Sequence, residues 1–157
     1  SCHIMFWFSM HYYTDTLRMF SSRTDLVIDP FPLIWLKSDN IGLLPDPERG
    51  PRRVYETAFF GSRGDRKITR AKSNAYAAPT DRSLHMSTKP EPVLRHFFEM
   101  FVDSNSLVLD PTAGSGSALR AAESLNARYV LGLERNEEFA DQANAALNKA
   151  RRLGRTA

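Results

Sequence analysis

The sequence contains a single cysteine, Cys2, among its 157 residues. One thiol excludes an internal disulfide, which fits a reducing compartment. Long apolar runs are also missing, since the run from Ile4 to Phe8 is far too short to span a membrane and follows no basic leader. No targeting segment and no internal repeat are visible. We therefore expect neither a membrane partner nor a bound metal ion.

The composition is that of an ordinary globular protein, with 42% hydrophobic and 25% charged residues. A chain of this length predicts one domain with a substantial core. The formal net charge of +3 and the pI of about 9.2 permit binding to nucleic acid without requiring it. Composition alone therefore does not select a function.

The most informative segment is 107–116, which reads Leu-Val-Leu-Asp-Pro-Thr-Ala-Gly-Ser-Gly. Its apolar start predicts a buried parallel strand, and a helical pattern begins directly after the second glycine. Strand, glycine turn and helix together form the nucleotide-binding corner of an open α/β sheet. Glycine suits this turn because the backbone bends sharply and a ligand can approach without a Cβ in the way.

A second apolar strand, 129–133, ends at Glu134. An acid at this point, roughly 20 residues beyond the glycines, is placed to accept hydrogen bonds from two ribose hydroxyls. Leu119 stands where a dinucleotide fingerprint has its third glycine, and no Lys-Ser/Thr pair follows the turn, so the segment is not a P-loop. The alternative to a ligand-binding turn is a glycine turn that only joins a strand to a helix and binds no ligand.

Hydrophobic patterning predicts the other elements. Strands are expected at 4–8, 26–28, 33–37 and 54–60, helices at 12–20, 90–101, 117–125 and 137–152, and long loops at 38–53 and 61–84. We expect the first strand to be central and buried, and 54–60 to pair with 33–37 as the antiparallel edge of a mixed sheet. Asn136 is the expected N-cap of the last helix.

Three groups of segments occur in an order that resembles a known family. They are 33–37 with 55–60, then His85-Met86-Ser87-Thr88-Lys89-Pro90 opening a helix, then 110–116 with 132–139. The arrangement is similar to the C-terminal part of the DNA methylases that modify the exocyclic amine of adenine or cytosine. It matches their permuted order, in which the catalytic region precedes the region that binds S-adenosylmethionine (SAM). The resemblance covers nearly the whole chain.

The resemblance implies a Rossmann-like, SAM-dependent methyltransferase fold with a mixed, mostly parallel sheet. It implies one domain, 1–157, in which 1–84 is the rest of the catalytic and target side and 85–157 is the SAM-binding half. Glu134 takes the ribose hydroxyls, and the first amides of the helix after Gly116 suit the SAM carboxylate. Lys89 is equally well explained as a solvated lysine at a helix start. The residues implied to bind SAM are Asp110, Pro111, Thr112, Ala113, Gly114, Ser115, Gly116, Glu134, Arg135, Asn136, Thr88 and Lys89.

The catalytic signature of this family, Asp/Asn/Ser-Pro-Pro-aromatic, is not present in the 157 residues. In the family it ends the strand before the one placed at 4–8, so we expect a chain that lacks its N-terminal catalytic strand and loop. The nearest look-alike is Asp29-Pro30-Phe31-Pro32, with the aromatic third instead of fourth, which makes Asp29 the candidate catalytic residue. The alternatives are a decayed, non-catalytic relative that binds DNA or SAM, and an enzyme of the same fold acting on RNA or protein.

The resemblance also implies the partners and setting of the protein. DNA is the expected substrate, and a homodimer is expected because dimers are common in this family. The expected setting is the cytoplasm of a bacterium, or of the host cell for a viral protein, with a restriction-modification system as context. The basic loop from Arg63 to Lys72 is expected either to contact DNA phosphates or to be solvated.

Overall fold

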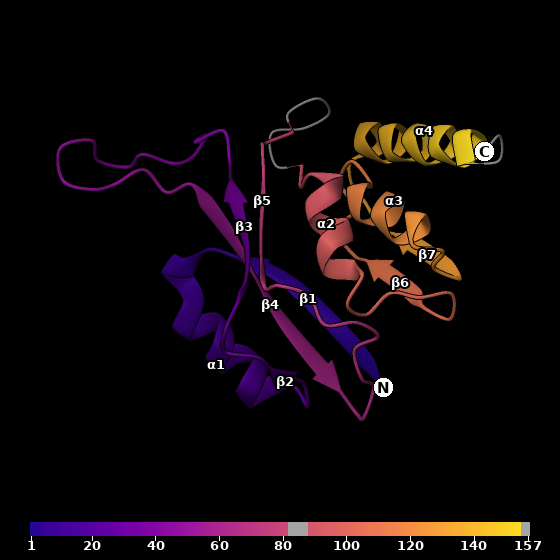
Figure 1. Ribbon diagram of the computed structural model, residues 1–157, viewed down its shortest axis with the longest axis horizontal. Helices are drawn as coiled ribbons and strands as arrows, with labels where there is room; N and C mark the ends of the chain where they lie inside the picture. Colours follow the sequence, from indigo (N-terminus) through magenta and orange to yellow (C-terminus); the bar gives the residue numbers. More distant parts are fainter. Residues whose placement is uncertain (82–87, 155–157) are drawn as a thin grey trace. The chain divides into compact units, whose positions relative to one another are not determined.

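The computed structural model describes residues 1–81 and 88–154. The chain forms two compact units, Ser1–Pro79 and Thr80–Ala157. Each unit has its own β-sheet together with one or more helices, and in the second unit helices alternate with strands (Figure 1). The expected α/β class is therefore confirmed.

The first unit is built around its longest strand, β4. Its elements are β1 (Cys2–Phe8), η1 (Met10–Tyr12), α1 (Tyr13–Arg23), β2 (Val27–Ile28), β3 (Leu33–Lys37), β4 (Tyr55–Arg63) and β5 (Ala75–Ala78). β4 pairs antiparallel with β1, β2 and β3, and β3 pairs parallel with β5. The predicted pairing of β3 with β4 is confirmed, but β4 is the centre of the sheet and not its edge. β4 is central because β1 pairs with it on one side, while β3 pairs with its first part and β2 with its far end on the other side.

Two further expectations about this sheet are wrong. Among the described strands β1 pairs only with β4, so it lies at one end of the sheet and is partly exposed. β5 lies inside the expected loop 61–84, because its sequence, Ala-Tyr-Ala-Ala, is poor in strand formers and forms a strand only by pairing with β3. Within this sheet three pairings are antiparallel and one is parallel among the described strands, so the expected mixed sheet is confirmed.

Large side chains from three strands fill the core of the first unit. Phe59 of β4 is fully buried and stacks on Phe8 of β1, with 4.1 Å between the ring centroids. Trp35 of β3 is also buried, and its Nε1 donates a hydrogen bond to the carbonyl oxygen of Ala78 at 2.9 Å. This bond ties β3 to the end of β5 and gives the indole N–H its buried partner.

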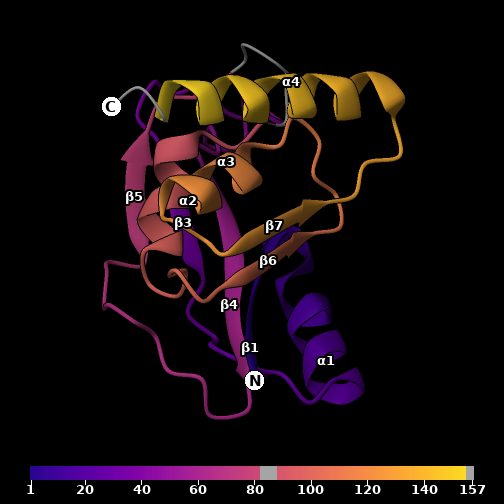
Figure 2. The same ribbon diagram turned by 90° about the vertical axis from the view of Figure 1, so that its right-hand side faces the viewer.

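The second unit contains a pair of parallel strands and three helices. Its elements are α2 (Glu91–Phe98), β6 (Leu107–Asp110), α3 (Ser117–Ser124), β7 (Tyr129–Gly132) and α4 (Glu137–Gly154). β6 and β7 run in register from Leu107 opposite Tyr129 to Asp110 opposite Gly132. Because the strands are parallel and level, the segments that follow their carboxyl ends lie beside each other. Figure 2 shows α3 and α4 on one side of this strand pair.

Close packing joins α3 to the strands. A Cβ added at Gly132 of β7 would lie 2.6 Å from Cδ1 of Leu119, so glycine is what allows α3 to approach so closely. Leu119, Ala113 and Leu147 of α4 form a buried cluster against Val130. Leu107 and Leu109 point to the opposite face and are 73% and 60% exposed. Within the second unit, the predicted buried strand is therefore covered on the face against which α3 packs.

Candidate functional site

The glycine turn between β6 and α3 is folded by hydrogen bonds of its own residues. The Asp110 Oδ1 atom accepts a hydrogen bond from the Thr112 amide at 3.0 Å and lies 3.4 Å from the Thr112 hydroxyl. The Ala113 amide donates to the carbonyl oxygen of Leu133 at 2.9 Å. The turn is therefore fixed at its start by Asp110 and joined in its middle to the chain that follows β7.

Both glycines of the turn have the positive φ angles that favour glycine. The φ angle is 49° at Gly114 and 73° at Gly116. A Cβ at Gly114 would meet no heavy atom within 4 Å, whereas one at Gly116 would lie 3.0 Å from the Cβ of Ala143. Gly114 therefore faces open space that a ligand can enter, and Gly116 is packed against α4.

The Glu134 carboxylate is bound to the glycine turn. Its Oε2 accepts a hydrogen bond from the Gly114 amide at 2.9 Å, and its Oε1 accepts one from the Asn136 amide at 2.8 Å. These backbone hydrogen bonds, first from Asn136 and then from Gly114, lower the pKa of Glu134 below its ordinary value. A carboxylate has about four acceptor positions, so each oxygen keeps capacity for a ligand hydroxyl.

The N-terminus of α3 has no side-chain cap. Its N-cap is Gly116, and no acidic residue stands in the first turn of this eight-residue helix. The first amides of a helix have no partner within the helix and carry a partial positive charge. This helix end therefore suits an anionic group of a ligand.

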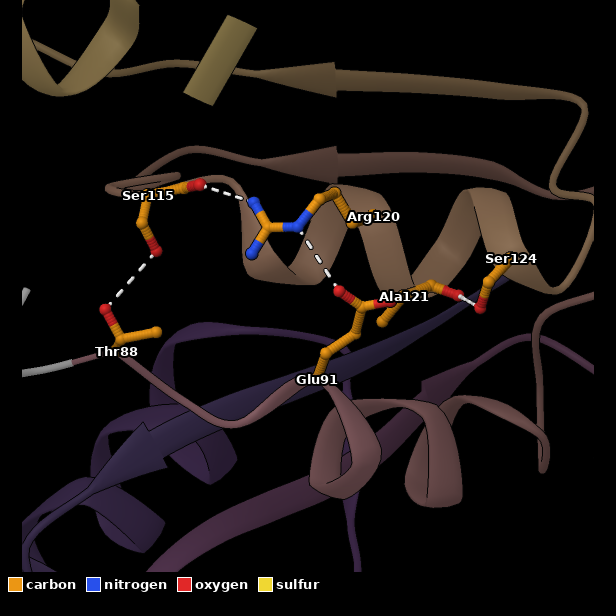
Figure 3. A network of polar contacts seen from close by, with 6 residues as sticks. All are labelled: Thr88, Glu91, Ser115, Arg120, Ala121 and Ser124. Atoms are coloured by element: carbon orange, nitrogen blue, oxygen red, sulfur yellow. Dashed lines mark hydrogen bonds and ion pairs between the residues drawn. The ribbon is translucent and has the colours of Figure 1, made fainter. Parts of the chain in front are cut away.

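Thr88 lies beside the turn, at the start of the segment that leads into α2. Its Oγ1 is 3.4 Å from Oγ of Ser115, and both residues are buried (Figure 3). Lys89 follows and is partly buried, and Pro90 is the N-cap of α2. The structure thus brings Thr88 to the predicted turn, while residues 85–87 of the same motif lie outside the described part of the chain.

The two residues after Glu134 have different local roles. Asn136 accepts a hydrogen bond from the Phe139 amide at 3.2 Å through its Oδ1, which confirms it as the N-cap of α4. Arg135 is exposed, and its charge contributes to the lowered pKa of Glu134. Both residues therefore support the geometry or charge of the Glu134 carboxylate.

Asp29, the candidate catalytic residue, belongs to the first unit. Its Oδ1 accepts a hydrogen bond from the Phe31 amide at 2.9 Å, and its own amide donates to the carbonyl oxygen of Phe60. The side chain thus closes a local turn of the kind that aspartate commonly forms. A catalytic role for Asp29 stays a prediction.

One residue at the turn was missed by the sequence reasoning. Arg120, in the first turn of α3, donates a hydrogen bond from Nη1 to the carbonyl oxygen of Ser115 at 2.7 Å, and its Nε donates to Oε2 of Glu91 at 3.2 Å (Figure 3). The sequence signal that could have indicated a role for Arg120 is its position near the start of the predicted helix. A cation there is unfavourable, because it opposes the helix dipole. Such a residue calls for a partner that offsets its charge.

Within 1–81 and 88–154, no group of three or more His, Cys, Asp or Glu side chains is arranged to hold a metal ion. No helix in this part of the chain is long and apolar enough to cross a membrane.

Comparison with known families identifies the chain. The model of a DNA methylase family, the N-6/N-4 type, matches residues 33–145. The match covers well over half of the chain, and the chain therefore belongs to this family, the SAM-dependent amino-methyltransferases of DNA.

Curated relatives match a shorter stretch. The type II methyltransferase M.HindIII of Haemophilus influenzae is 38% identical over 69 residues, covering 44% of this chain and 21% of that protein. The putative methylase YubD of Escherichia coli K12 is 38% identical over 73 residues, covering 45% of this chain and 32% of that protein. The matched stretch thus spans a third or less of either relative.

Solved structures show the same fold. M1.HpyAVI in complex with SAM superposes with a TM-score of 0.77 at 18% identity, over 93% of this chain and 74% of that chain. The cytosine-N4-specific PvuII DNA methyltransferase gives a TM-score of 0.66 at 15% identity, over 87% and 56%. A putative DNA modification methylase from Thermus thermophilus, complexed with SAM, gives 0.67 at 16% identity, over 94% and 69%. The expected Rossmann-like methyltransferase fold is confirmed.

Proposed function

We propose that the second unit of this chain binds SAM at the glycine turn. The observation that carries the proposal is the hydrogen bond between the Glu134 carboxylate and the Gly114 amide, 20 residues apart in sequence and 2.9 Å apart in space. It places an ionised acceptor, an open glycine and the uncapped start of α3 at one turn. These three features match a ribose, a ligand in close approach and a carboxylate respectively.

Different residues of the site contact different parts of SAM. Glu134 accepts the ribose hydroxyls, with Arg135 and Asn136 keeping its carboxylate ionised and oriented. The amides at the start of α3 donate to the methionine carboxylate. By the family resemblance Asp110, Thr112, Gly114 and Gly116 line the methionine side, and Thr88 and Lys89 lie at its border. Pro111, Ala113 and Ser115 complete the turn.

We further propose that the protein containing this chain methylates DNA, on N-6 of adenine or N-4 of cytosine. Bound SAM supplies an electrophilic methyl group. A base inside a duplex is reached only after it is rotated out of the stack. This chain contributes the binding and orientation that bring the two reactants together, which is a large part of catalysis for a direct transfer. Asp29 remains the candidate residue to accept hydrogen bonds from the amine of the base.

The basic segment that follows β4 is the proposed contact with DNA phosphates. Arg63 forms an ion pair with Asp25 at 2.7 Å, whereas Lys67 and Arg70 are exposed. Exposed cations on a loop suit a sequence-independent contact with the backbone, which weakens as salt is raised. The solvated-loop alternative predicts that neutralising Lys67 and Arg70 leaves the salt dependence of DNA binding unchanged.

A second candidate function is a non-catalytic SAM- or DNA-binding module. It is favoured by the absence of an Asp/Asn/Ser-Pro-Pro-aromatic tetrapeptide from the 157 residues. A SAM-binding module requires the same SAM site as the enzyme and differs from it only in that no methyl group is transferred. A module that binds only DNA requires no SAM site.

The test combines a titration with a transfer assay. SAM is titrated calorimetrically into the folded chain, and the chain is then incubated with methyl-labelled SAM and duplex DNA. Mass spectrometry of the digested DNA separates 6-methyladenine from 4-methylcytosine. Methylated base shows that this chain transfers the methyl group. If SAM binds without methylated base, the assay is repeated with the longer protein that contains this chain, and the absence of methylated base there too identifies the non-catalytic module. A folded chain that does not bind SAM contradicts the proposal.

The dependence of SAM binding on pH provides a further prediction. Because the pKa of Glu134 is lowered, its carboxylate stays charged above the ordinary carboxyl range and becomes protonated only below it. SAM affinity is therefore expected to be flat from pH 8 down to about pH 5 and to fall in more acid solution. Calorimetry across this range measures the affinity, and circular dichroism at each pH shows whether the chain is folded. A change in affinity centred between pH 6 and pH 7, on the order of an ordinary histidine pKa, contradicts the assignment to Glu134.

A further inference from the structure

The side chain of Arg120 is the part of the turn that the proposed SAM contacts do not explain. It is only 13% exposed although it carries a charge. Its guanidinium donates hydrogen bonds to the Ser115 carbonyl oxygen, 2.7 Å from Nη1, and to the Glu91 carboxylate, 3.2 Å from Nε (Figure 3). A buried guanidinium is stable only when such partners offset its loss of water.

These contacts fix one peptide plane of the turn. Arg120 holds the carbonyl oxygen of Ser115, and the amide of Gly116, in the same peptide group, donates to the carbonyl oxygen of Ala113 at 2.7 Å. A peptide group is a rigid plane, so holding its oxygen and its N–H also fixes its rotation. That rotation determines the positive φ of Gly116 and the direction in which α3 starts.

Helix stability does not account for an arginine at this position. The N-terminal end of a helix favours acids and disfavours cations, and α3 has no acid in its first turn. The offsetting charge comes from Glu91, the first residue of α2, which is itself favourable there. Arg120 and Glu91 therefore connect the start of α2, next to Thr88 and Lys89, with the glycine turn.

We propose that Arg120, held by Glu91, is a positioning residue of the SAM site, which rests on the function proposed above. It keeps the Ser115–Gly116 peptide in the orientation that directs the first amides of α3 toward the SAM carboxylate. It also keeps the segment containing Thr88 beside the turn. The competing role is a purely structural ion pair between α2 and α3.

The matched control is another ion pair of α3. Arg151 of α4 binds the carboxylate of Glu123 through Nε and Nη2, at an exposed position away from the turn. Arg120→Met and Arg151→Met each remove one such arginine without large loss of volume. Arg120→Lys keeps the charge but cannot reach both partners with a fixed fork.

SAM affinity and thermal unfolding are measured for the wild type and for each variant of the 157-residue chain. Arg120→Met is expected to raise the Kd for SAM by about 10-fold or more, the size of one lost charge-assisted hydrogen bond. Arg120→Lys is expected to recover part of the affinity, and Glu91→Gln to lose less than Arg120→Met. Arg151→Met is expected to leave the Kd unchanged. An unchanged Kd in Arg120→Met, or an equal loss in Arg151→Met, overturns the proposal.

A second readout needs no ligand. The amide resonance of Gly116 is expected to be single and sharp in the wild type and in Arg151→Met, and broadened or doubled in Arg120→Met, where the peptide is free to rotate. If the wild type binds no SAM, the proposed function fails, while this resonance still decides whether Arg120 positions the peptide. If Arg120→Met does not fold, Arg120→Lys and Glu91→Gln give the same test, and an unchanged Gly116 resonance in both overturns the proposal.

Discussion

Replacing Glu134 with glutamine is expected to weaken SAM binding by about 100-fold. The two hydrogen bonds from the ribose hydroxyls then no longer go to a charged acceptor. In the structure each carboxylate oxygen accepts one backbone amide, from Gly114 or from Asn136. A glutamine side chain keeps one oxygen and replaces the other with an NH₂ group, which cannot accept a hydrogen bond. The variant therefore loses the negative charge and also one of the two bonds that orient the side chain.

Calorimetric titration of SAM measures this effect, beside a matched control, Glu137→Gln. Glu137 is an exposed acid in the first turn of α4, so its substitution removes the same charge a few residues away. Thermal unfolding shows whether either variant is destabilised. The control is expected to bind SAM within about twofold of the wild type, since exposed surface charges contribute little. Equal losses in both variants would mean that net charge, and not the Glu134 carboxylate, governs binding.

Alanine at Gly114 is expected to abolish most SAM binding with only the cost in stability of its positive φ, whereas alanine at Gly116 is expected to destabilise the fold further. Both residues have positive φ, which costs a residue with a Cβ about 1–2 kcal/mol. At Gly114 the added methyl group meets no protein atom and occupies space open to a ligand. At Gly116 it also crowds Ala143, which raises the expected cost to about 2–4 kcal/mol.

Denaturant unfolding measures the stability of both variants, and calorimetry measures their affinity for SAM. Gly50→Ala is the control, because a Cβ there meets only the Asp46 carbonyl oxygen at 3.7 Å, an ordinary contact. The Gly50→Ala substitution is expected to change neither the free energy of unfolding nor the affinity for SAM. A Gly114→Ala chain that binds SAM like the wild type would show that the cofactor does not approach the turn at this glycine.

The local elements of the site were predictable because their signals are local. An apolar run, an acid, two glycines and a helical pattern follow one another within 107–124, and the structure forms β6, the turn and α3 from them. Glu134 was predictable from its place after the next apolar strand. The structure confirms that it lies beside the turn, since its Oε2 accepts the Gly114 amide.

Pairings between distant segments were not predictable in the same way. β5 has a weak strand sequence and forms by pairing with β3, more than 35 residues earlier in the chain. β4 was expected at an edge but takes partners on both sides along its length. Such pairings depend on which segments bury surface together and share hydrogen bonds, and a sequence pattern records only the local preference of each segment.

The sequence by itself determined the family, the glycine turn and the acid that serves it, because the covalent order of those residues already specifies a strand, a turn and a helix. Only the tertiary structure decided which face of β6 is covered and which charged groups hold the turn. Arg120 and Glu91 are 29 residues apart and stand on different helices, and no periodicity links them. They meet because α2 and α3 pack together, and a buried charge then requires a partner at that place.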